Sequence, residues 1–123
     1  MQTFTKAERL SSKRDIDKLV ETGKSFNCGF FKIIWKEINE GSIPAQIIIS
    51  VPKRLFKKAV DRNRLKRLTR EAYRKNKNIL YKNLNSKKVL LMFVYKSKTI
   101  VGFAEIEKNI IIAMQQLIEN VNS

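Results

Sequence analysis

The feature that most constrains the fold of this chain is the uneven distribution of its positive charge. The 123 residues include 26 Lys+Arg and 11 Asp+Glu, which gives a formal net charge of +15. Residues 53–77 alone hold 12 of the basic and 2 of the acidic side chains, a net charge of +10. Two-thirds of the excess positive charge therefore lies in one segment of 25 residues. A polyanion is therefore the expected class of partner.

Length and hydrophobic content indicate a single folded unit. A chain of 123 residues has the usual size of one domain. Hydrophobic residues make up 43% of it, which is enough for a core and too much for a disordered polycation. The sequence shows no fixed-period repeat, Pro/Gly-rich linker or low-complexity tail. We therefore expect one domain over residues 1–123.

The periodicity of the apolar residues predicts an α+β domain in two layers, a central sheet packed by helices, with the order αββαβα. The predicted elements are helices over residues 13–22, 58–77 and 103–121 and strands over residues 30–38, 45–51 and 88–95. We expect residues 39–42 to join the first two strands as a hairpin. The run 88–95 is apolar on both faces, which is typical of a central strand. The basic helix then lies in the crossover between the second and third strands.

The helix predicted over residues 58–77 has two distinct sides. Leu65, Leu68 and Ala72 form a narrow apolar stripe. At 100° per residue, the opposite side is a predicted cationic ridge of Asn63, Lys66, Arg67, Arg70, Arg74 and Lys77. Like charges four residues apart cost a few tenths of a kcal/mol per pair, so we expect an anionic partner to offset them. The two carboxylates of this segment, Asp61 and Glu71, are expected to point away from the ridge.

Composition excludes several kinds of chemistry. There is no histidine, which removes His-based acid/base catalysis and His metal ligands. The single cysteine, Cys28, excludes an intramolecular disulfide and a CxxC zinc site, and we interpret it as a small structural residue in a reducing compartment. The longest apolar run, residues 89–95, is too short to span a bilayer, and the first residues lack the apolar segment of a secretory signal. We expect a cytoplasmic protein without membrane contact.

The most specific string in the chain is DRNRLKRLTRE at residues 61–71, preceded by VPKR at residues 51–54. It resembles the RNR motif of the bacterial ribonuclease P protein family, and the element order extends the resemblance over most of the chain. The resemblance implies an RNA-binding subunit of an endoribonuclease that removes the 5′ leader of precursor tRNA. In that family a catalytic RNA subunit carries out the Mg²⁺-dependent hydrolysis, and the protein binds the leader and supports the use of metal. The family also implies a left-handed crossover, where the general rule for parallel βαβ units would predict a right-handed one.

Carried over position by position, the resemblance assigns RNA contacts to the helix and to the basic pair before it. The residues assigned in this way are Lys53, Arg54, Arg62, Asn63, Arg64, Lys66, Arg67 and Arg70. Arg74 of the predicted cationic ridge completes the set of predicted RNA-binding residues. Five of the chain's eight arginines are in this set at positions 62–74, and arginine is the better residue for bidentate phosphate contacts. Asn63 has a second interpretation as a helix-capping or buried polar residue.

The family's second surface is a cleft between the first helix and the sheet, which binds single-stranded leader and is often lined by aromatic residues. The corresponding positions here, Ile16, Val20 and Ile34, are aliphatic. Either this cleft binds the leader through shape and backbone contacts, with Lys32 and Lys36, or Phe30 stacks on a base. The alternative that the three aliphatic residues are ordinary core has about even weight. The aromatic residues Phe26, Phe31 and Trp35 are predicted to lie in the core.

Three functions remain open from the sequence. The first is the ribonuclease P protein subunit, with the RNA subunit and precursor tRNA as partners, no obligate protein partner and Mg²⁺ bound mainly by RNA. The second is a ribosomal or nucleoid nucleic-acid-binding protein that uses the same helix. The third, a stand-alone nuclease, is disfavoured because such an enzyme needs clustered carboxylates. No residue is assigned to catalysis, and a metal site on the protein stays undetermined.

Overall fold

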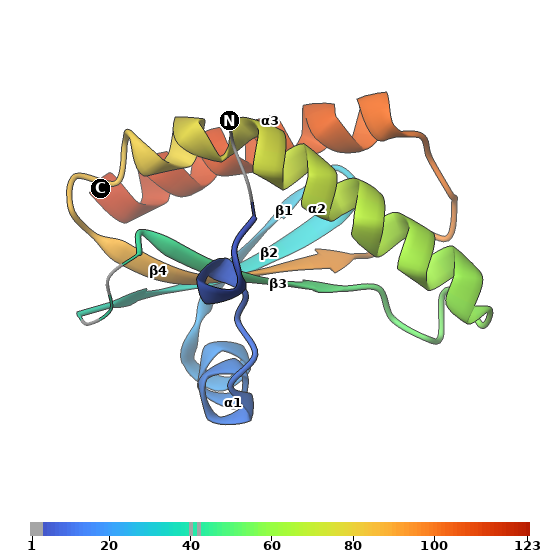
Figure 1. The fold of residues 1–123 in the computed structure, drawn as a ribbon, viewed down its shortest axis with the longest axis horizontal. Helices are drawn as coiled ribbons and strands as arrows, with labels where there is room; N and C mark the ends of the chain where they lie inside the picture. The colour runs from blue at the N-terminus through green and yellow to red at the C-terminus, as the bar shows by residue number, and fades with distance from the viewer. Residues whose placement is uncertain (1–3, 40, 42) are drawn as a thin grey trace.

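The computed structural model describes residues 4–39, 41 and 43–123. Within these residues, a four-stranded mixed sheet has α1 on one face and α2 and α3 on the other (Figure 1). The elements in chain order are η1 (Lys6–Glu8), α1 (Lys13–Thr22), β1 (Lys24–Cys28), β2 (Phe31–Ile38), β3 (Ala45–Ser50), α2 (Ala59–Tyr81), β4 (Lys88–Tyr95) and α3 (Phe103–Asn122). The predicted α+β class is confirmed.

The strand order of the sheet is β1-β2-β4-β3. β4 pairs antiparallel with β2 and parallel with β3, and the five residues from Val89 to Phe93 are all buried. The prediction of a central strand from its uninterrupted apolar run is therefore confirmed. α2 joins the parallel strands β3 and β4 across the upper face of the sheet in Figure 1, and the crossover is left-handed, as the family resemblance implies.

Two expectations about the strands were wrong. The segment 39–42 is not a hairpin connection, because β4 lies between β2 and β3; residues 40 and 42 themselves lie outside the described part of the chain. The strand β1 was missed altogether. It has only two apolar side chains, Phe26 and Cys28, and it gains its partners by pairing antiparallel with β2, where Phe26 lies opposite Ile33.

Alternating side chains of β2 and β4 build two cores on opposite faces of the sheet. The main core lies under α2 and α3 and includes Phe31, Ile33, Trp35, Leu65, Tyr73, Leu91, Phe93, Ile106, Ile110, Met114 and Leu117. A smaller core faces α1 and consists of Leu10, Leu19, Leu90 and Met92, with Ile16 and Ile34 packed against it. The core assignment of Phe31 and Trp35 is confirmed, while Phe26 is half-buried against the main core.

Ser12 and Gly23 define the two ends of α1. The Ser12 hydroxyl accepts a hydrogen bond from the Asp15 backbone N–H at 3.3 Å, which caps the first turn. At the other end, the Gly23 backbone N–H donates to the Leu19 carbonyl oxygen at 2.8 Å. Gly23 has a φ of −72°, so glycine is required there by space: a Cβ would lie 2.4 Å from that carbonyl oxygen. This close approach lets the chain turn directly from α1 into β1.

Candidate nucleic-acid interface

One side of α2 faces away from the sheet and is rich in cations. This basic face of α2 consists of Asn63, Arg64, Lys66, Arg67 and Arg70. Asn63, Arg64 and Arg67 are exposed, whereas Lys66 and Arg70 are half-buried along the flank next to β3. The structure shows no salt bridge from any of the five to another described residue. The charges of Arg64 and Arg67 therefore face open surface, whereas those of Lys66 and Arg70 lie along the flank of the helix.

The buried stripe of α2 is rotated slightly from the predicted one. Leu65 and Ala72 are fully buried, as predicted, but Leu68 is only half-buried and Thr69 and Tyr73 are fully buried instead. The Thr69 hydroxyl donates to the Leu65 carbonyl oxygen at 2.8 Å, so its burial leaves no unpaired group. The helix also continues to Tyr81, about one turn beyond its predicted end.

Arg62 uses part of its guanidinium to shape the start of α2. Its Nη1 donates to the carbonyl oxygens of Phe56 and Lys57, at 2.8 Å in each case. These bonds tie the first turn of the helix to the loop before it, where Lys58 at the N-cap offers no side-chain cap. Arg62 is half-buried, so the structure gives this predicted RNA-binding residue an additional structural role.

Arg74 lies at the C-terminal side of the basic face and is paired. Its Nε donates to Glu71 Oε2 at 3.0 Å within one turn of helix. The hydrogen bond from Arg74 lowers the pKa of Glu71, and Glu71 in turn raises the pKa of Arg74. The expectation that Glu71 points away from the predicted ridge was therefore wrong, since its carboxylate reaches a member of that ridge. Both side chains are partly open to water, which screens the pair, so it adds little to stability.

Lys77 does not belong to the exposed ridge. It is 8% exposed, and its ammonium lies 2.9 and 2.8 Å from the two carboxylate oxygens of Glu8. The helical wheel predicts the direction in which Lys77 leaves the helix. It does not predict that the N-terminal segment covers this part of α2 and buries the side chain. The Tyr81 hydroxyl and the Thr5 backbone N–H also donate to Glu8. Burial raises the pKa of Glu8, but these donors outweigh it and bring the pKa down to about 2.

The pairing of Glu8 with Lys77 was not predicted from the sequence. The pattern Thr5-x-x-Glu8 is a capping-box signal and could have located the short helix η1. It could not have located the partner, which is 69 residues further along the chain.

The basic pair Lys53 and Arg54 lies in the turn between β3 and α2. Both side chains are exposed, and the turn is closed by the Leu55 backbone N–H, which donates to the Pro52 carbonyl oxygen at 3.1 Å. Phe56 is 7% exposed and packs against Tyr95, which anchors the loop to the main core. In Figure 1 this loop lies at the N-terminal end of α2, so the pair extends the cationic surface beyond the helix.

The residues of the predicted leader cleft come from α1 and from the face of the sheet that α1 covers. Ile16 and Ile34 are half-buried and pack against the smaller core, whereas Val20 is 55% exposed. Lys32 is exposed, and the Lys36 ammonium donates to the Thr22 hydroxyl at 2.7 Å. The structure thus brings five of the six predicted cleft residues to this face, as an aliphatic floor with lysines beside it.

Phe30 lies outside the cleft. It occupies the turn before β2, packs against the main core on the opposite face of the sheet, and stacks on Tyr95 with ring centroids 6.4 Å apart. Asn109 on α3 fixes this turn by accepting a hydrogen bond from the Phe30 backbone N–H at 3.0 Å. The suggestion that Phe30 stacks on a base in the cleft was therefore wrong.

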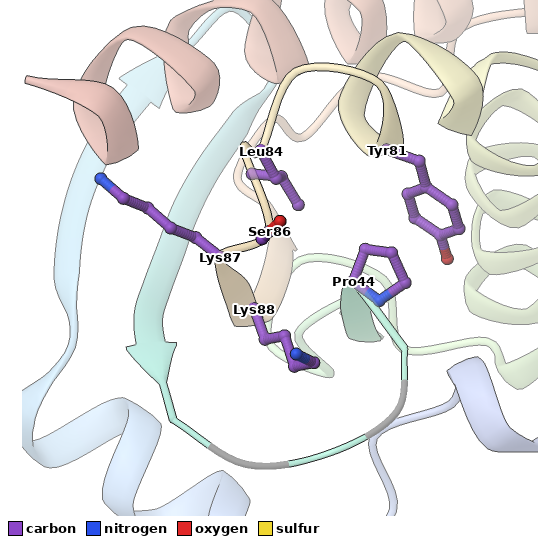
Figure 2. Close-up of a pocket in the computed structure, with 6 residues that line it drawn as sticks. All are labelled: Pro44, Tyr81, Leu84, Ser86, Lys87 and Lys88. Carbon is purple, nitrogen blue, oxygen red and sulfur yellow. The ribbon is translucent and has the colours of Figure 1, made fainter.

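A separate cavity of about 240 Å³ lies beyond the C-terminal end of α2 (Figure 2). It is lined by Pro44, Tyr81, Leu84, Ser86, Lys87 and Lys88. The Lys87 ammonium points away from it and donates to the Val121 carbonyl oxygen at 2.8 Å. Of the two lysines that line the cavity, only Lys88 has an ammonium that is not directed away from it in this way. We assign no nucleic-acid contact to this cavity.

The acidic side chains of the described residues are not clustered. Among residues 4–39, 41 and 43–123, no group of three or more His, Cys, Asp or Glu side chains is close enough to hold a metal ion. Oxygen ligands such as carboxylates are what Mg²⁺ requires. In the same residues, none of the helices is both long and apolar enough to cross a bilayer.

Comparison with known proteins agrees with this geometry. The family model described as ribonuclease P matches residues 4–118. The ribonuclease P protein component of Porphyromonas gingivalis is 30% identical over 98% of this chain and 90% of its own length. That of Chlorobaculum tepidum is 34% identical over 76% of this chain and 67% of its own length.

Solved structures show the same fold. The ribonuclease P protein of Thermotoga maritima matches 89% of this chain and 96% of its own chain, with a TM-score of 0.73 and 24% identity. The Staphylococcus aureus protein matches 91% of this chain and 95% of its own, with a TM-score of 0.69 and 21% identity. Since the family model covers nearly the whole chain, which contains the RNR string on an exposed helix, the chain belongs to the ribonuclease P protein family.

Proposed function

We propose that this protein is the RNA-binding subunit of a ribonuclease P that removes the 5′ leader from precursor tRNA. The observation that carries the proposal is the basic face of α2, where Arg64 and Arg67 are exposed and no cation makes a salt bridge within the described residues. Phosphate groups of a folded RNA are the ligands that such a row of guanidinium and ammonium groups fits best. The basic face of α2 then binds the catalytic RNA subunit close to the cleavage site.

In this proposal the cleavage chemistry belongs to the RNA subunit. Hydrolysis of a phosphodiester by a protein with Mg²⁺ needs several carboxylates around the metal, and no such cluster is present in the described residues. Mg²⁺ is therefore held mainly by RNA. The protein contributes positive charge and helps to position the RNA. It acts in the cytoplasm, where its buried Cys28, which forms no disulfide, stays reduced.

The cleft beneath the sheet is proposed to hold the single-stranded leader. Its floor of Ile16 and Ile34 offers an apolar surface for sugars and bases, and Lys32 offers charge for the backbone. The exposed Val20 extends this apolar surface into solvent. Because the floor is aliphatic, binding there depends on shape and backbone contacts, with little preference for base identity.

The test of the proposed function is a charge reversal on the basic face. Both Arg64 and Arg67 are exposed, so Arg64→Glu/Arg67→Glu should leave the free energy of unfolding nearly unchanged. Each lost charge-assisted phosphate contact is worth about 1.5–3 kcal/mol, so affinity for the RNA subunit should fall by at least about tenfold. Leader removal at limiting Mg²⁺ should slow in parallel.

A matched control is available on α1. Arg14→Glu/Lys18→Glu changes the net charge by the same amount at two exposed positions on the outer side of that helix. Affinity is measured by titrating labelled RNA subunit, and processing by the appearance of 5′-mature tRNA. Equal effects of the two double variants would show that only net charge matters, and would contradict a specific role for the basic face of α2.

A further inference from the structure

A cavity of about 250 Å³ lies where the N-terminal segment crosses between β3 and α2. Its walls come from three parts of the chain: the segment before α1, strand β3 and the flank of α2. The residues that matter here are Phe4, Arg9, Ser11, Ile48, Lys66 and Arg70. Two of them, Lys66 and Arg70, belong to the basic face of α2, whereas Arg9 is 57 or more residues away in sequence and was not among the predicted site residues.

The cavity gathers positive charge without a counter-ion. Arg9, Lys66 and Arg70 all line it, and no acidic residue is among the described residues of its wall. The neighbouring carboxylate, Glu8, is turned the other way and is bound to Lys77. Burial and the nearby positive charge of Arg9 both lower the pKa of Arg70, as expected for like charges held close together. An anion placed between these groups would relieve that repulsion.

The N-terminal segment holds Arg9 in place through its backbone. The Leu10 backbone N–H donates to the Ile47 carbonyl oxygen at 2.7 Å, and the Gln46 side-chain amide donates to the Ala7 carbonyl oxygen at 3.1 Å. Leu10 is 3% exposed in the smaller core. Together with the buried Glu8, these contacts fix both neighbours of Arg9, so its side chain starts from a rigid position. A site built on fixed elements loses little entropy when a ligand binds.

One wall of the cavity is aromatic. The Phe4 ring packs edge-on against Tyr73, with ring centroids 6.1 Å apart, and the Arg9 guanidinium carbon lies 5.7 Å from the centre of the Phe4 ring. A cation–π contact holds the guanidinium near the ring without using up its N–H groups, so those that do not face the ring can donate to an anion. The exposed Ser11 adds a hydroxyl at the same cavity.

We propose that Arg9, Lys66 and Arg70 form a binding site for a backbone phosphate of RNA, with Phe4 and Ile48 as an apolar wall for the attached sugar. The site extends the RNA interface from α2 over the N-terminal segment to the edge strand β3. It deepens the proposed function and rests on it, because it takes its ligand from the same RNA partners. The positioning of Arg9 by Glu8 and Leu10 is part of the site.

The experiment compares two single substitutions that remove the same charge. Arg9→Gln removes the cation at the cavity, and Arg14→Gln removes one from the exposed outer side of α1. Arg9→Gln should weaken RNA binding by about tenfold, the size of one charge-assisted hydrogen-bonded contact, and reduce the slope of log K against log salt by about 0.7–0.9. Arg14→Gln should change affinity less than twofold.

Two measurements identify which RNA supplies the phosphate. The affinity of the free protein for the RNA subunit is measured first, and the affinity of the assembled holoenzyme for precursor tRNA second. A loss in the first alone assigns the site to the RNA subunit, and a loss in the second alone assigns it to the tRNA. Arg9→Lys, which keeps the charge but loses the planar donor pair, should restore the salt slope and only part of the affinity.

Further measurements distinguish failure of the cavity site from misfolding and from failure of the proposed function. Circular dichroism and thermal melting should match wild type for Arg9→Gln, because only the backbone of Arg9 bonds to the sheet. If Arg9→Gln behaves like Arg14→Gln in both RNA assays while Arg64→Glu/Arg67→Glu still fails to bind, the cavity site is overturned and the proposed function stands. If the double variant also binds normally, the proposed function itself is wrong.

Discussion

The carboxylate of Glu8 joins the N-terminal segment to α2 through donors from Thr5, Lys77 and Tyr81. Substitution Glu8→Gln leaves the buried Lys77 ammonium without its counter-ion, which costs about 3–5 kcal/mol of unfolding free energy. The double variant Glu8→Gln/Lys77→Met removes both charges and should recover part of this loss. Chemical denaturation of the four proteins in this cycle measures the coupling. A double variant that is less stable than Glu8→Gln alone would contradict the assignment.

The same residue makes stability depend on pH in the acid range. The pKa of Glu8 is about 2 in the folded protein and has an ordinary value of 4.5. A lowered folded-state pKa means that the stabilisation is fully present above about pH 5 and is lost as the pH falls toward 2, in total on the order of 3 kcal/mol. Denaturation midpoints between pH 2 and 6 should therefore fall steeply for wild type and less steeply for Glu8→Gln. Parallel pH profiles for the two proteins would rule this out.

Leu19 and Val20 are neighbours on α1, but the first is buried and the second is exposed. Substitutions at the two positions can therefore distinguish an effect on folding from an effect on leader binding. Leu19 is fully buried, so Leu19→Ala should cost about 2–5 kcal/mol of stability. Val20 is 55% exposed, so Val20→Ala should change stability by less than about 0.5 kcal/mol. If the cleft binds leader, Val20→Ala should weaken holoenzyme affinity for precursor tRNA with a long leader and leave affinity for leaderless tRNA unchanged. Equal loss for both RNAs would place Val20 outside the leader path.

At the scale of elements, the long periodic segments could be predicted and the short ones could not. α2 and α3 have apolar stripes over many turns, and β4 is an uninterrupted apolar run, so local pattern alone determines them. β1 has five residues and no such pattern, because its stability comes from pairing with β2. For the same reason the position of β4 between β2 and β3 could not be read from sequence: strand order depends on contacts between distant segments.

In the candidate site, too, features set within one helix could be predicted, and features set by contacts with distant segments could not. Asn63 and Arg67 of the predicted ridge are exposed in the structure, since a helical wheel fixes angles along one helix. Lys77 lies at the angle expected but is buried, because the segment around Glu8 crosses the helix there. Arg9 reaches the edge of the basic face for the same reason. A wheel contains no information on which other segment covers the helix.

The turn between β1 and β2 depends on a contact with α3. Gly29 has a φ of +54°, and a Cβ there would lie 1.6 Å from the Asn109 Oδ1 that accepts from the Phe30 backbone N–H. Gly29→Ala should therefore cost about 2–3 kcal/mol, from the left-handed backbone and the displaced hydrogen bond. In an Asn109→Ala background the same substitution should cost only about 1–2 kcal/mol, because the clash is gone. Urea denaturation of the four proteins tests this, and an unchanged cost in that background would contradict it.

At the scale of the whole molecule, the net charge of +15 should make RNA affinity strongly dependent on salt. With about six phosphates neutralised, log K falls with log salt at a slope of about −4 to −5. The slope for Arg64→Glu/Arg67→Glu should be smaller by about two contacts. Filter-binding or fluorescence titrations of the RNA subunit between low and moderate salt measure both slopes. A slope near zero for the wild-type protein would contradict phosphate-dominated binding.

The central position of β4 has a consequence for how the protein is made. During synthesis β1, β2 and β3 leave the ribosome first, and α2 follows them. The strand β4, which joins β2 and β3 into one sheet, leaves the ribosome only after α2. Until residue 95 has emerged, β2 and β3 each have an open edge and the arginine-rich helix has no completed scaffold. A nascent chain at that stage is both cationic and unfinished, next to ribosomal RNA. Pairing of β4 with β2 and β3 completes the sheet on which α2 packs, so under the proposed function selective RNA binding has to await this last pairing step.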